Sequence, residues 1–300
     1  MTALALAVDI GGTKMAAGLV DPDGTLLARA QVPTRPTAGG AEAEGERELL
    51  WHDLAKMVGA VRGQVGSGDT VVTCGVGCGG PMGPGGDHVS PLNIAGWREF
   101  PLRARLAELL GVPTFVDNDA KALAIGEGWL GAAAGQENFV GMVVSTGVGG
   151  GIVLNGRLLE GGSGNAGHIG HVIVVPDGRD CVCGGRGCLE AEASGTAIAA
   201  MTGRGAEHAP ADVVARTGRL VGLAVASVVN LLDLPLAVIS GSVAFGFGAP
   251  FFAAAQAEVD TRCGLDFARG ARVVPGELGD RGPLVGAGRI GWSGLGGRGA

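Results

Sequence analysis

The sequence predicts an α/β protein built from two domains. A chain of 300 residues can bury one large hydrophobic core or two smaller ones, and the usual length of a domain favours two domains. Short apolar runs typical of strands alternate with longer segments in which apolar residues recur at helical spacing. An apolar run, a glycine-rich turn and a second apolar run also follow one another twice. We expect an N-terminal α/β domain over residues 1–118 and a larger C-terminal α/β domain over 119–300, whose last helix is a candidate to pack back on the N-terminal domain.

The N-terminal domain is predicted to open as an antiparallel meander. Its first three apolar runs, 3–8, 15–20 and 26–32, are separated by turns too short to hold a helix. Residues 35–46 are expected to form an exposed loop. Apolar spacing and apolar runs then predict a helix over 47–62, a strand at 70–76, a helix near 102–110 and a strand at 114–117.

The C-terminal domain is predicted to begin with a second meander. Strands are expected at 139–145 and 151–155, with the glycine-rich segment from Ser145 to Gly151 as the turn. The remaining pattern predicts helices at roughly 190–202 and 212–232, a strand at 236–240, a helix at 250–260, a strand at 271–274 and a frayed glycine-rich tail over 291–300.

Composition excludes several classes of protein. An apolar content of 46% against 17% charged residues does not fit a disordered chain. A net charge of −7 gives no support for a nucleic-acid or anionic membrane partner. The chain shows neither a secretory signal nor a clean stretch of about 20 apolar residues, so we expect a cytoplasmic protein. Its six cysteines are then expected to be thiols or metal ligands.

The first candidate site is the segment Asp9-Ile10-Gly11-Gly12-Thr13-Lys14. Glycines let backbone N–H groups approach phosphate oxygens, and Thr13 and Lys14 add a hydroxyl donor and a cation. A plain hairpin turn would explain the glycines alone. It would not explain Asp9 at the strand end, or the second glycine turn with its own hydroxyl pair, Ser145 and Thr146. We therefore expect a nucleotide held between two domains.

The second candidate site is Asp117-Asn118-Asp119, directly after an apolar run. Ligands of α/β proteins bind at the carboxyl ends of strands, so a carboxylate here could act as a general base. The alternative is a helix N-cap, because Asn and Asp are favoured there. Both interpretations can hold together.

The third candidate site is a metal centre. His171, Cys181, Cys183 and Cys188 provide one imidazole and three thiolates, which match a tetrahedral Cys₃His zinc site. A catalytic cysteine is less favoured because no single thiol has a base partner. Cys74, Cys78 and Cys263 are scattered and are expected to be buried as small apolar residues.

Residues beside the zinc ligands are the fourth candidate. A metal that fixes His171 also fixes its neighbours, so His168 and Glu190 could present hydrogen-bonding groups to a polyhydroxylated ligand. The alternative for Glu190 is a carboxylate in the first turn of a helix, stabilised by the helix dipole.

Together these motifs resemble those of the ROK family of sugar kinases, repressors and related proteins. The resemblance covers nearly the whole chain and implies the two-domain actin-like (ribonuclease-H-like) ATPase fold. The motifs are DIGGTK at 9–14, PLNIAGW at 91–97, VDNDA at 116–120, STGVGGGI at 145–152, AGxxGH at 166–171, CxCGxxGC at 181–188 and ISG at 239–241.

The resemblance also implies roles for individual residues. Asp119 would be the base that takes the proton of the sugar 6-hydroxyl. The residues that would bind sugar hydroxyls are Asn93, Asn118, His171 and Glu190, with His168 against the C1–C2 side of the sugar. The residues that would bind ATP are Asp9, Gly11, Gly12, Thr13, Lys14, Thr146, Gly147 and Gly149, with Gly241 near the adenosine.

Three positions depart from the family's commonest pattern. His168 stands where Glu is usual, Lys121 where Asn is frequent, and Ser242 where a second Gly is often found. The histidine resembles bacterial N-acylmannosamine kinases rather than typical glucokinases, because an imidazole does not replace a carboxylate as a two-oxygen acceptor.

The expected function is an ATP- and Mg²⁺-dependent kinase acting on the 6-hydroxyl of a hexose or N-acetylhexosamine, with N-acetylmannosamine slightly favoured and structural Zn²⁺ in place. The alternatives are a glucokinase and a non-catalytic sugar-binding sensor. Family repressors carry a DNA-binding segment before the first glycine turn, where only eight residues precede Asp9. We therefore expect sugar and ATP as partners, no nucleic acid or membrane, and a homodimer or homotetramer.

Overall fold

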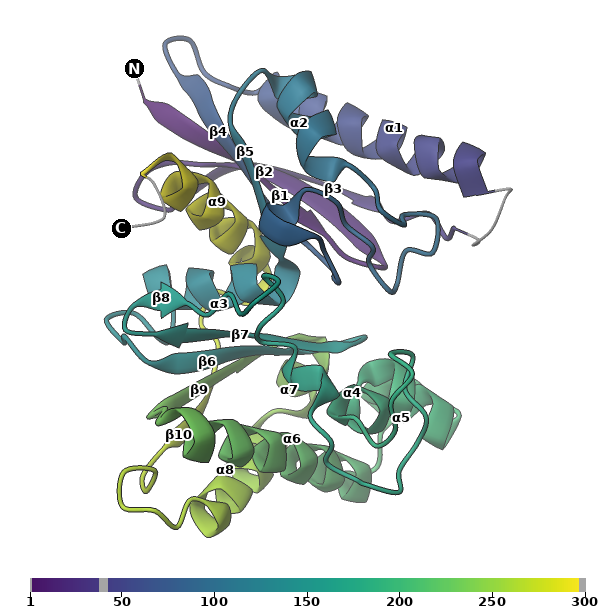
Figure 1. Cartoon of the computed structure of the whole chain (residues 1–300), viewed down its shortest axis with the longest axis vertical. Coiled ribbons are helices and arrows are strands. Elements are labelled where there is room, and N and C mark those ends of the chain that lie inside the picture. The colour runs from purple at the N-terminus through teal and green to yellow at the C-terminus, as the bar shows by residue number, and fades with distance from the viewer. Residues whose placement is uncertain (1, 38–42, 297–300) are drawn as a thin grey trace. The chain divides into compact units, whose positions relative to one another are not determined.

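The computed structural model describes residues 2–37 and 43–296, which form two compact units (Figure 1). Unit 1 comprises Met1–Gly126, Glu160–Ala166 and Asp280–Ala300, and unit 2 comprises Glu127–Leu159 and Gly167–Gly279. The contacts thus divide the chain at Gly126 instead of after residue 118. The reason is helix α3 (Asp119–Leu130), whose first residues pack in unit 1 and whose last residues pack in unit 2.

Unit 1 contains a five-stranded sheet in the order β3-β2-β1-β4-β5. The strands are β1 (Ala3–Ile10), β2 (Lys14–Val20), β3 (Leu26–Pro33), β4 (Thr70–Cys78) and β5 (Thr114–Asn118). The first three pair antiparallel, which confirms the predicted meander, and β4 and β5 join in parallel. Parallel pairing brings the carboxyl ends of β1, β4 and β5 to one edge of the sheet, where the first two motifs lie.

Helices cover both faces of this sheet. Figure 1 shows α1 (Ala43–Arg62) and α2 (Leu102–Leu110) on one face and α9 (Gly282–Leu295) on the other. The last helix therefore belongs to unit 1. It continues to Leu295, so the predicted frayed tail is wrong for 291–295, and 297–300 lie outside the described residues. Part of the predicted loop at 35–46 is also helical, because α1 begins at residue 43; residues 38–42 are outside the description.

Close backbone packing explains why α9 is so glycine-rich. A Cβ atom added to Gly75 in β4 would lie 1.8 Å from the carbonyl oxygen of Ala287 in α9. One added to Gly286 would lie 1.8 Å from the carbonyl oxygen of Ala122 in α3. The glycines at 286, 288 and 291 are therefore packing residues of a buried helix.

Unit 2 contains a second five-stranded sheet, in the order β10-β9-β6-β7-β8. The strands are β6 (Phe139–Val144), β7 (Val148–Leu154), β8 (Arg157–Leu158), β9 (Leu236–Ser240) and β10 (Arg272–Pro275). The glycine turn is shorter than predicted, because β7 begins at Val148 and includes Gly149, Gly150 and Gly151. Gly150 serves close packing, because a Cβ there would lie 2.8 Å from Cγ2 of Ile169.

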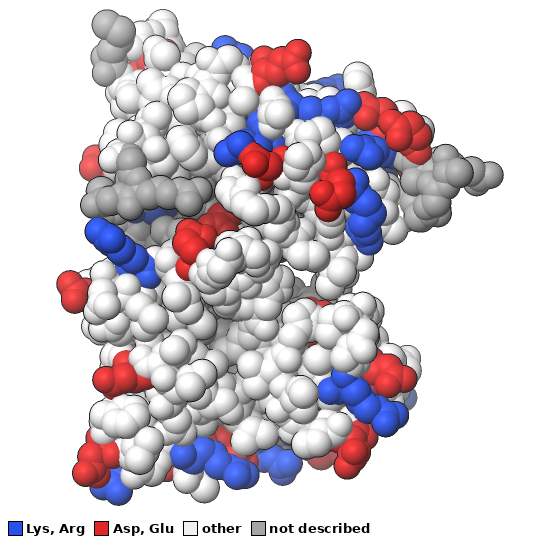
Figure 2. All heavy atoms as spheres, viewed as in Figure 1, with Lys and Arg blue, Asp and Glu red and all other residues white. Residues whose placement is uncertain are grey.

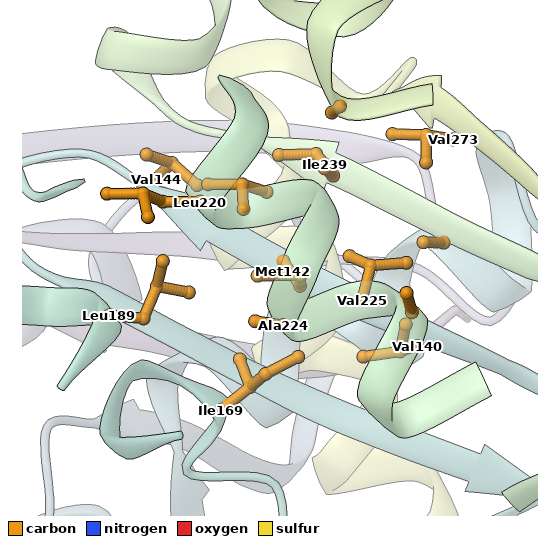
Figure 3. Close-up of a cluster of buried hydrophobic side chains, with 14 of the residues drawn as sticks. Val140, Met142, Val144, Ile169, Leu189, Leu220, Ala224, Val225, Ile239 and Val273 are labelled. Carbon is orange, nitrogen blue, oxygen red and sulfur yellow. The ribbon is translucent and has the colours of Figure 1, made fainter. Parts of the chain in front are cut away.

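The core of unit 2 lies between this sheet and helix α6 (Ala211–Leu232), which also packs on α8 (Ala249–Arg262). Figure 3 shows Leu220, Ala224 and Val225 of α6 over Met142 of β6 and Ile239 of β9.

Two features of the helices in unit 2 were not predicted. The helix expected over 190–202 is split into α4 (Leu189–Ala193) and α5 (Gly195–Thr202), because Ser194 is extended and its hydroxyl caps α5 by accepting from the Ala197 N–H. A short helix, α7 (Ser242–Phe247), follows β9.

Surface charge and helix hydropathy add two further observations. Basic and acidic side chains are interspersed on the face drawn in Figure 2. Among residues 2–37 and 43–296, no helix combines the length and the apolar character that a bilayer crossing requires.

Candidate functional site

The first glycine turn joins β1 to β2 in unit 1. The Gly11 N–H donates to the Lys14 carbonyl at 3.0 Å, and the Thr34 hydroxyl donates to the Gly11 carbonyl at 2.7 Å. A Cβ added to Gly12 would lie 2.6 Å from Cβ of Asn93, so the turn packs directly on a predicted sugar-binding residue. Thr34, the residue directly after β3, supports the turn, and no local sequence pattern indicated it.

Asp9, the last residue but one of β1, is a buried carboxyl group with 8% of its surface exposed. Burial, together with the negative charge of Asp119, raises its pKa from 3.8 to about 7, although Lys14 and Arg29 oppose the shift. The structure therefore brings Asp9 and Asp119 into one electrostatic site, as the strand-end positions of the two motifs suggested. Such a carboxyl group would bind a cation or a hydrogen-bond donor well.

Asp119 begins helix α3 at the end of β5. The Asn118 side-chain oxygen caps this helix by accepting from the N–H groups of Ala120 at 3.0 Å and Lys121 at 3.3 Å. The Asp119 carboxylate also accepts from the Ala120 N–H at 2.9 Å. Asn118 therefore caps the helix, which was the alternative interpretation of this motif. Its amide N–H groups are still suited to donate to a ligand.

Lys121 is a structural centre of unit 1 that sequence reasoning did not assign. It is 1% exposed, and its Nζ lies 3.1 Å from carboxylate oxygens of both Asp117 and Glu160. It also donates to the Gly164 carbonyl at 2.8 Å. The pKa of Asp117 is raised by burial, an effect that the neighbouring Lys121 charge opposes. Lys121 therefore anchors residues 160–166 to the helix that carries Asp119.

A second contact holds the same segment. The Asn165 side chain accepts from the Met82 N–H at 3.2 Å and donates to the Met82 carbonyl at 3.0 Å. Residues 160–166 are thus fixed in unit 1 at two places, next to the loop that leads to Asn93.

The second glycine turn joins β6 to β7 in unit 2. The N–H of Gly195 donates to the Ser145 carbonyl at 2.7 Å, and Thr196 donates through its N–H and its hydroxyl to the Thr146 carbonyl. The start of α5 therefore supports the turn. Gly147 lies in the turn itself, whereas Gly149 lies in β7 opposite Val143.

Glu190 contacts this turn. Its Oε2 accepts from the Val148 N–H at 2.9 Å, and a Cβ added to Gly147 would lie 2.8 Å from the same oxygen. Glu190 lies in the short helix α4, directly after the ligand Cys188. The helix that follows Cys188 thus contacts the predicted phosphate turn through the Glu190 side chain.

Gly241 approaches the second glycine turn from β9. It has a φ of +108°, and a Cβ at this position would lie 2.4 Å from the Val144 carbonyl oxygen, so only glycine fits here. The hydroxyls of Ser145 and Ser242 lie 2.9 Å apart and are hydrogen-bonded. The predicted phosphate turn and the predicted adenosine residue are therefore neighbours in unit 2.

Two glycines bring the histidine segment against β7. A Cβ at Gly167 would lie 2.7 Å from the Gly150 carbonyl oxygen, and one at Gly170 would lie 2.1 Å from that of Val148. The rings of His168 and His171 lie 5.9 Å apart at an interplanar angle of 20°. The segment that carries both imidazoles thus lies against the strand that follows the phosphate turn.

The four predicted metal ligands form one cluster. The ligand atoms of His171, Cys181, Cys183 and Cys188 all lie within 4.8 Å of one another. Nδ1 of His171 lies 3.7 Å from Sγ of Cys181, and the sulfurs of Cys183 and Cys188 lie 3.8 Å apart. Zinc–sulfur bonds of about 2.3 Å in a tetrahedron place sulfurs roughly 3.8 Å apart. The donor set and its spacing therefore fit structural zinc.

The predicted site residues fall into two groups. Unit 1 contains Asp9, the first turn from Gly11 to Lys14, Asn93, Asn118 and Asp119. Unit 2 contains Thr146, Gly147, Gly149, His168, His171, Glu190, Gly241 and the cysteine ligands. Each group is compact within its own unit, and the roles of these residues stay predictions.

Replacing Asp9 with Asn should raise stability in a pH-dependent way. The folded-state pKa of about 7 lies above the unfolded value of 3.8, so the unfolded chain loses its proton first and stability falls from pH 4 to pH 7. Asn lacks this ionisation. Asp9→Asn should match wild type near pH 4 and exceed its unfolding free energy at pH 8, by at most about 4 kcal/mol.

Chemical denaturation across this pH range tests the prediction, and the exposed Asp23→Asn controls for the loss of one negative charge. A stability gain that is the same at pH 4 and pH 8 would contradict the assignment.

The zinc site predicts about one zinc ion per chain. Cys183→Ser removes one thiolate and should lower metal content severalfold, and it should also weaken sugar binding because His171 and the start of α4 lose their anchor. Elemental analysis of protein purified without chelators measures the metal. Cys263→Ser is the matched control, because this buried cysteine of unit 2 is outside the cluster. Wild-type protein without zinc would refute the site.

Comparison with known proteins identifies relatives that cover two thirds or more of the chain. The chain is 37% identical over 204 residues to a glucokinase of Halalkalibacterium halodurans, and this match covers 67% of the chain but only 60% of that protein. It is 35% identical over 258 residues to the N-acetylmannosamine kinase of Yersinia pseudotuberculosis, covering 81% and 84%.

A solved structure gives the same result. The ROK family glucokinase of Streptomyces griseus, determined with glucose and AMPPNP, has a TM-score of 0.82 and 30% identity, covering 97% of this chain and 99% of that one. The likeness confirms the predicted fold class, an α/β protein with the two-domain actin-like ATPase fold. The model of the ROK family matches residues 5–290, and the chain therefore belongs to the ROK family.

Proposed function

We propose that this chain is an ATP-dependent kinase that phosphorylates the 6-hydroxyl of a hexose or N-acetylhexosamine. The observation that carries the proposal is the placement of Asp119 at the start of α3, electrostatically coupled to Asp9 beside the first glycine turn. A base for a hydroxyl and a turn suited to phosphate thus lie in one unit. The kinases among the relatives support the same reaction.

In the proposed reaction, Asp119 takes the proton of the sugar 6-hydroxyl as the oxygen attacks the γ-phosphorus of ATP, and ADP leaves. Phosphoryl transfer depends mainly on alignment and on neutralising charge. Asp119 lies in the first turn of α3, where the helix dipole favours a negatively charged side chain.

The glycine turns supply the phosphate contacts. Backbone N–H groups at 12–13 and 146–147 would bind phosphate oxygens, Gly11 would allow their close approach, and Lys14 would add a positive charge. Mg²⁺ would neutralise phosphate charge when bound, and Asp9 is the carboxylate that would hold it. A cation there favours the ionised form of Asp9, opposing the burial that raises its pKa.

Sugar binding would use polar residues named by the sequence motifs. Asn93, Asn118, His171 and Glu190 would hydrogen-bond the hydroxyls. We favour N-acetylmannosamine because His168 can donate as well as accept a hydrogen bond. Glucose is the second candidate, supported by the two glucokinase relatives.

Asp119→Asn should leave sugar and ATP binding largely intact and lower kcat by roughly 10²–10⁴, the usual contribution of a positioned general base. A coupled ADP-release assay with separate binding titrations measures both effects, and Asp23→Asn is again the control. A kcat within about threefold of wild type, a difference well under 1.4 kcal/mol, would remove Asp119 from the base role. Absence of ATP-dependent turnover in wild type would instead favour the sugar-binding sensor.

His168→Glu should shift substrate preference toward glucose. If the pocket uses the imidazole as a donor, a carboxylate leaves one polar partner unpaired, which costs about 1–3 kcal/mol, or five- to 150-fold in discrimination. Wild type should therefore have the higher kcat/KM for N-acetylmannosamine, and the variant should move the ratio toward glucose. A wild-type preference for glucose would refute the substrate but leave the kinase standing.

A further inference from the structure

A buried carboxylate lies in unit 2 beside the turn assigned to the nucleotide. Glu127 is completely buried, and four groups donate to it. Its Oε2 accepts from the N–H groups of Ala132 at 2.9 Å and Glu277 at 3.1 Å. Its Oε1 accepts from the Leu278 N–H at 3.2 Å and the Ser240 hydroxyl at 3.4 Å. All four donors are uncharged, so both carboxylate oxygens are fully used for backbone and hydroxyl contacts.

The surrounding backbone leaves space for this carboxylate on two sides. A Cβ added to Gly131 would lie 2.0 Å from Oε2 of Glu127. One added to Gly276 would lie 2.5 Å from Oε1 and 2.0 Å from the Ser240 hydroxyl oxygen. The carboxylate and the hydroxyl thus occupy a fitted space that even a methyl group would disrupt.

Ser240 connects this space to the nucleotide turn. It is the last residue of β9 and is 3% exposed, and Gly241 follows with its strained close approach to Val144. Ser242 then hydrogen-bonds Ser145 at 2.9 Å, at the start of the phosphate turn. A continuous series of contacts therefore leads from the buried carboxylate through the Gly241 turn to the phosphate turn.

We propose that Glu127 is a positioning residue for the nucleotide: its carboxylate fixes the end of β9, and through the Gly241 turn it sets the geometry in which ATP binds. The inference rests on the proposed function, since it takes the Gly241 and Ser145–Gly147 turns as the nucleotide site. It adds a residue that no motif of the sequence indicated and that itself touches no substrate.

The substitution Glu127→Gln tests the inference with little change in volume. An amide can accept through only one atom, so two of the four donors lose their acceptor and face an NH₂ group instead. Loss of well-placed hydrogen bonds should raise the Kd for AMPPNP about three- to tenfold. The Kd for the sugar should stay within a factor of about two, well below the effect of one lost hydrogen bond.

A second variant keeps the test valid if the first unfolds. Ser240→Ala removes only the hydroxyl that links Glu127 to the turn and leaves three donors on the carboxylate. It should raise the Kd for AMPPNP about two- to fivefold with a small change in Tm. Ser227→Ala is the matched control, because this exposed serine of α6 bonds only the Leu223 carbonyl of its own helix.

Calorimetric titration with AMPPNP, well below each variant's Tm, separates the outcomes. A lowered Tm with unchanged AMPPNP affinity in both variants would show a purely structural role and overturn the inference. Wild type that binds AMPPNP but phosphorylates no sugar would overturn the proposed function alone. Wild type that does not bind AMPPNP would overturn both.

Discussion

The burial of the Asp9 carboxyl group beside the negative charge of Asp119 is the constraint on which the site of unit 1 depends. Asp9 and Asp119 come from different strand ends, and the negative charge of Asp119 helps to raise the pKa of Asp9 to about 7. A protein core would not retain a buried carboxyl group beside a negative charge for stability, because this placement costs free energy. The arrangement becomes favourable when a cation or the developing charge of a reacting group enters, which is the expected signature of a functional site.

The rest of unit 1 holds this unfavourable pair in place. Asp9 is fixed in the middle of the sheet, where β1 pairs with both β2 and β4. Asp119 is fixed by the cap of α3, and Lys121, two residues later, neutralises the neighbouring carboxylate of Asp117. The close approach of Gly75 and Gly286 to adjacent backbone then secures the sheet and α3 against α9. Rigid elements can keep the two carboxyl groups close together despite the free-energy cost, whereas mobile loops would let them move apart.

Much of this arrangement could be predicted from local sequence. Strands, glycine turns and the Asn118 cap are set by residues close in the chain, and the zinc ligands within residues 181–188 follow a recognisable spacing. The predicted elements were wrong where contacts between distant residues determine the local structure. Gly149–Gly151 are strand residues, with Gly150 admitting Ile169. The helix at 190–202 breaks because Ser194 caps a second helix beside the Ser145 turn.

The contacts between distant parts of the chain could not be predicted at all. Glu127 is bound by groups at 240 and 277–278, and Lys121 by Glu160 and Gly164. No pattern within a window of 10 to 20 residues carries that information. The one signal for such contacts was a charged residue on an otherwise apolar helix, such as Lys121 or Glu127 in α3. A buried helix tolerates an isolated charge only when that charge has a partner elsewhere in the chain. Those two residues are also what ties α3, which begins with the proposed base, to the distant segments around it.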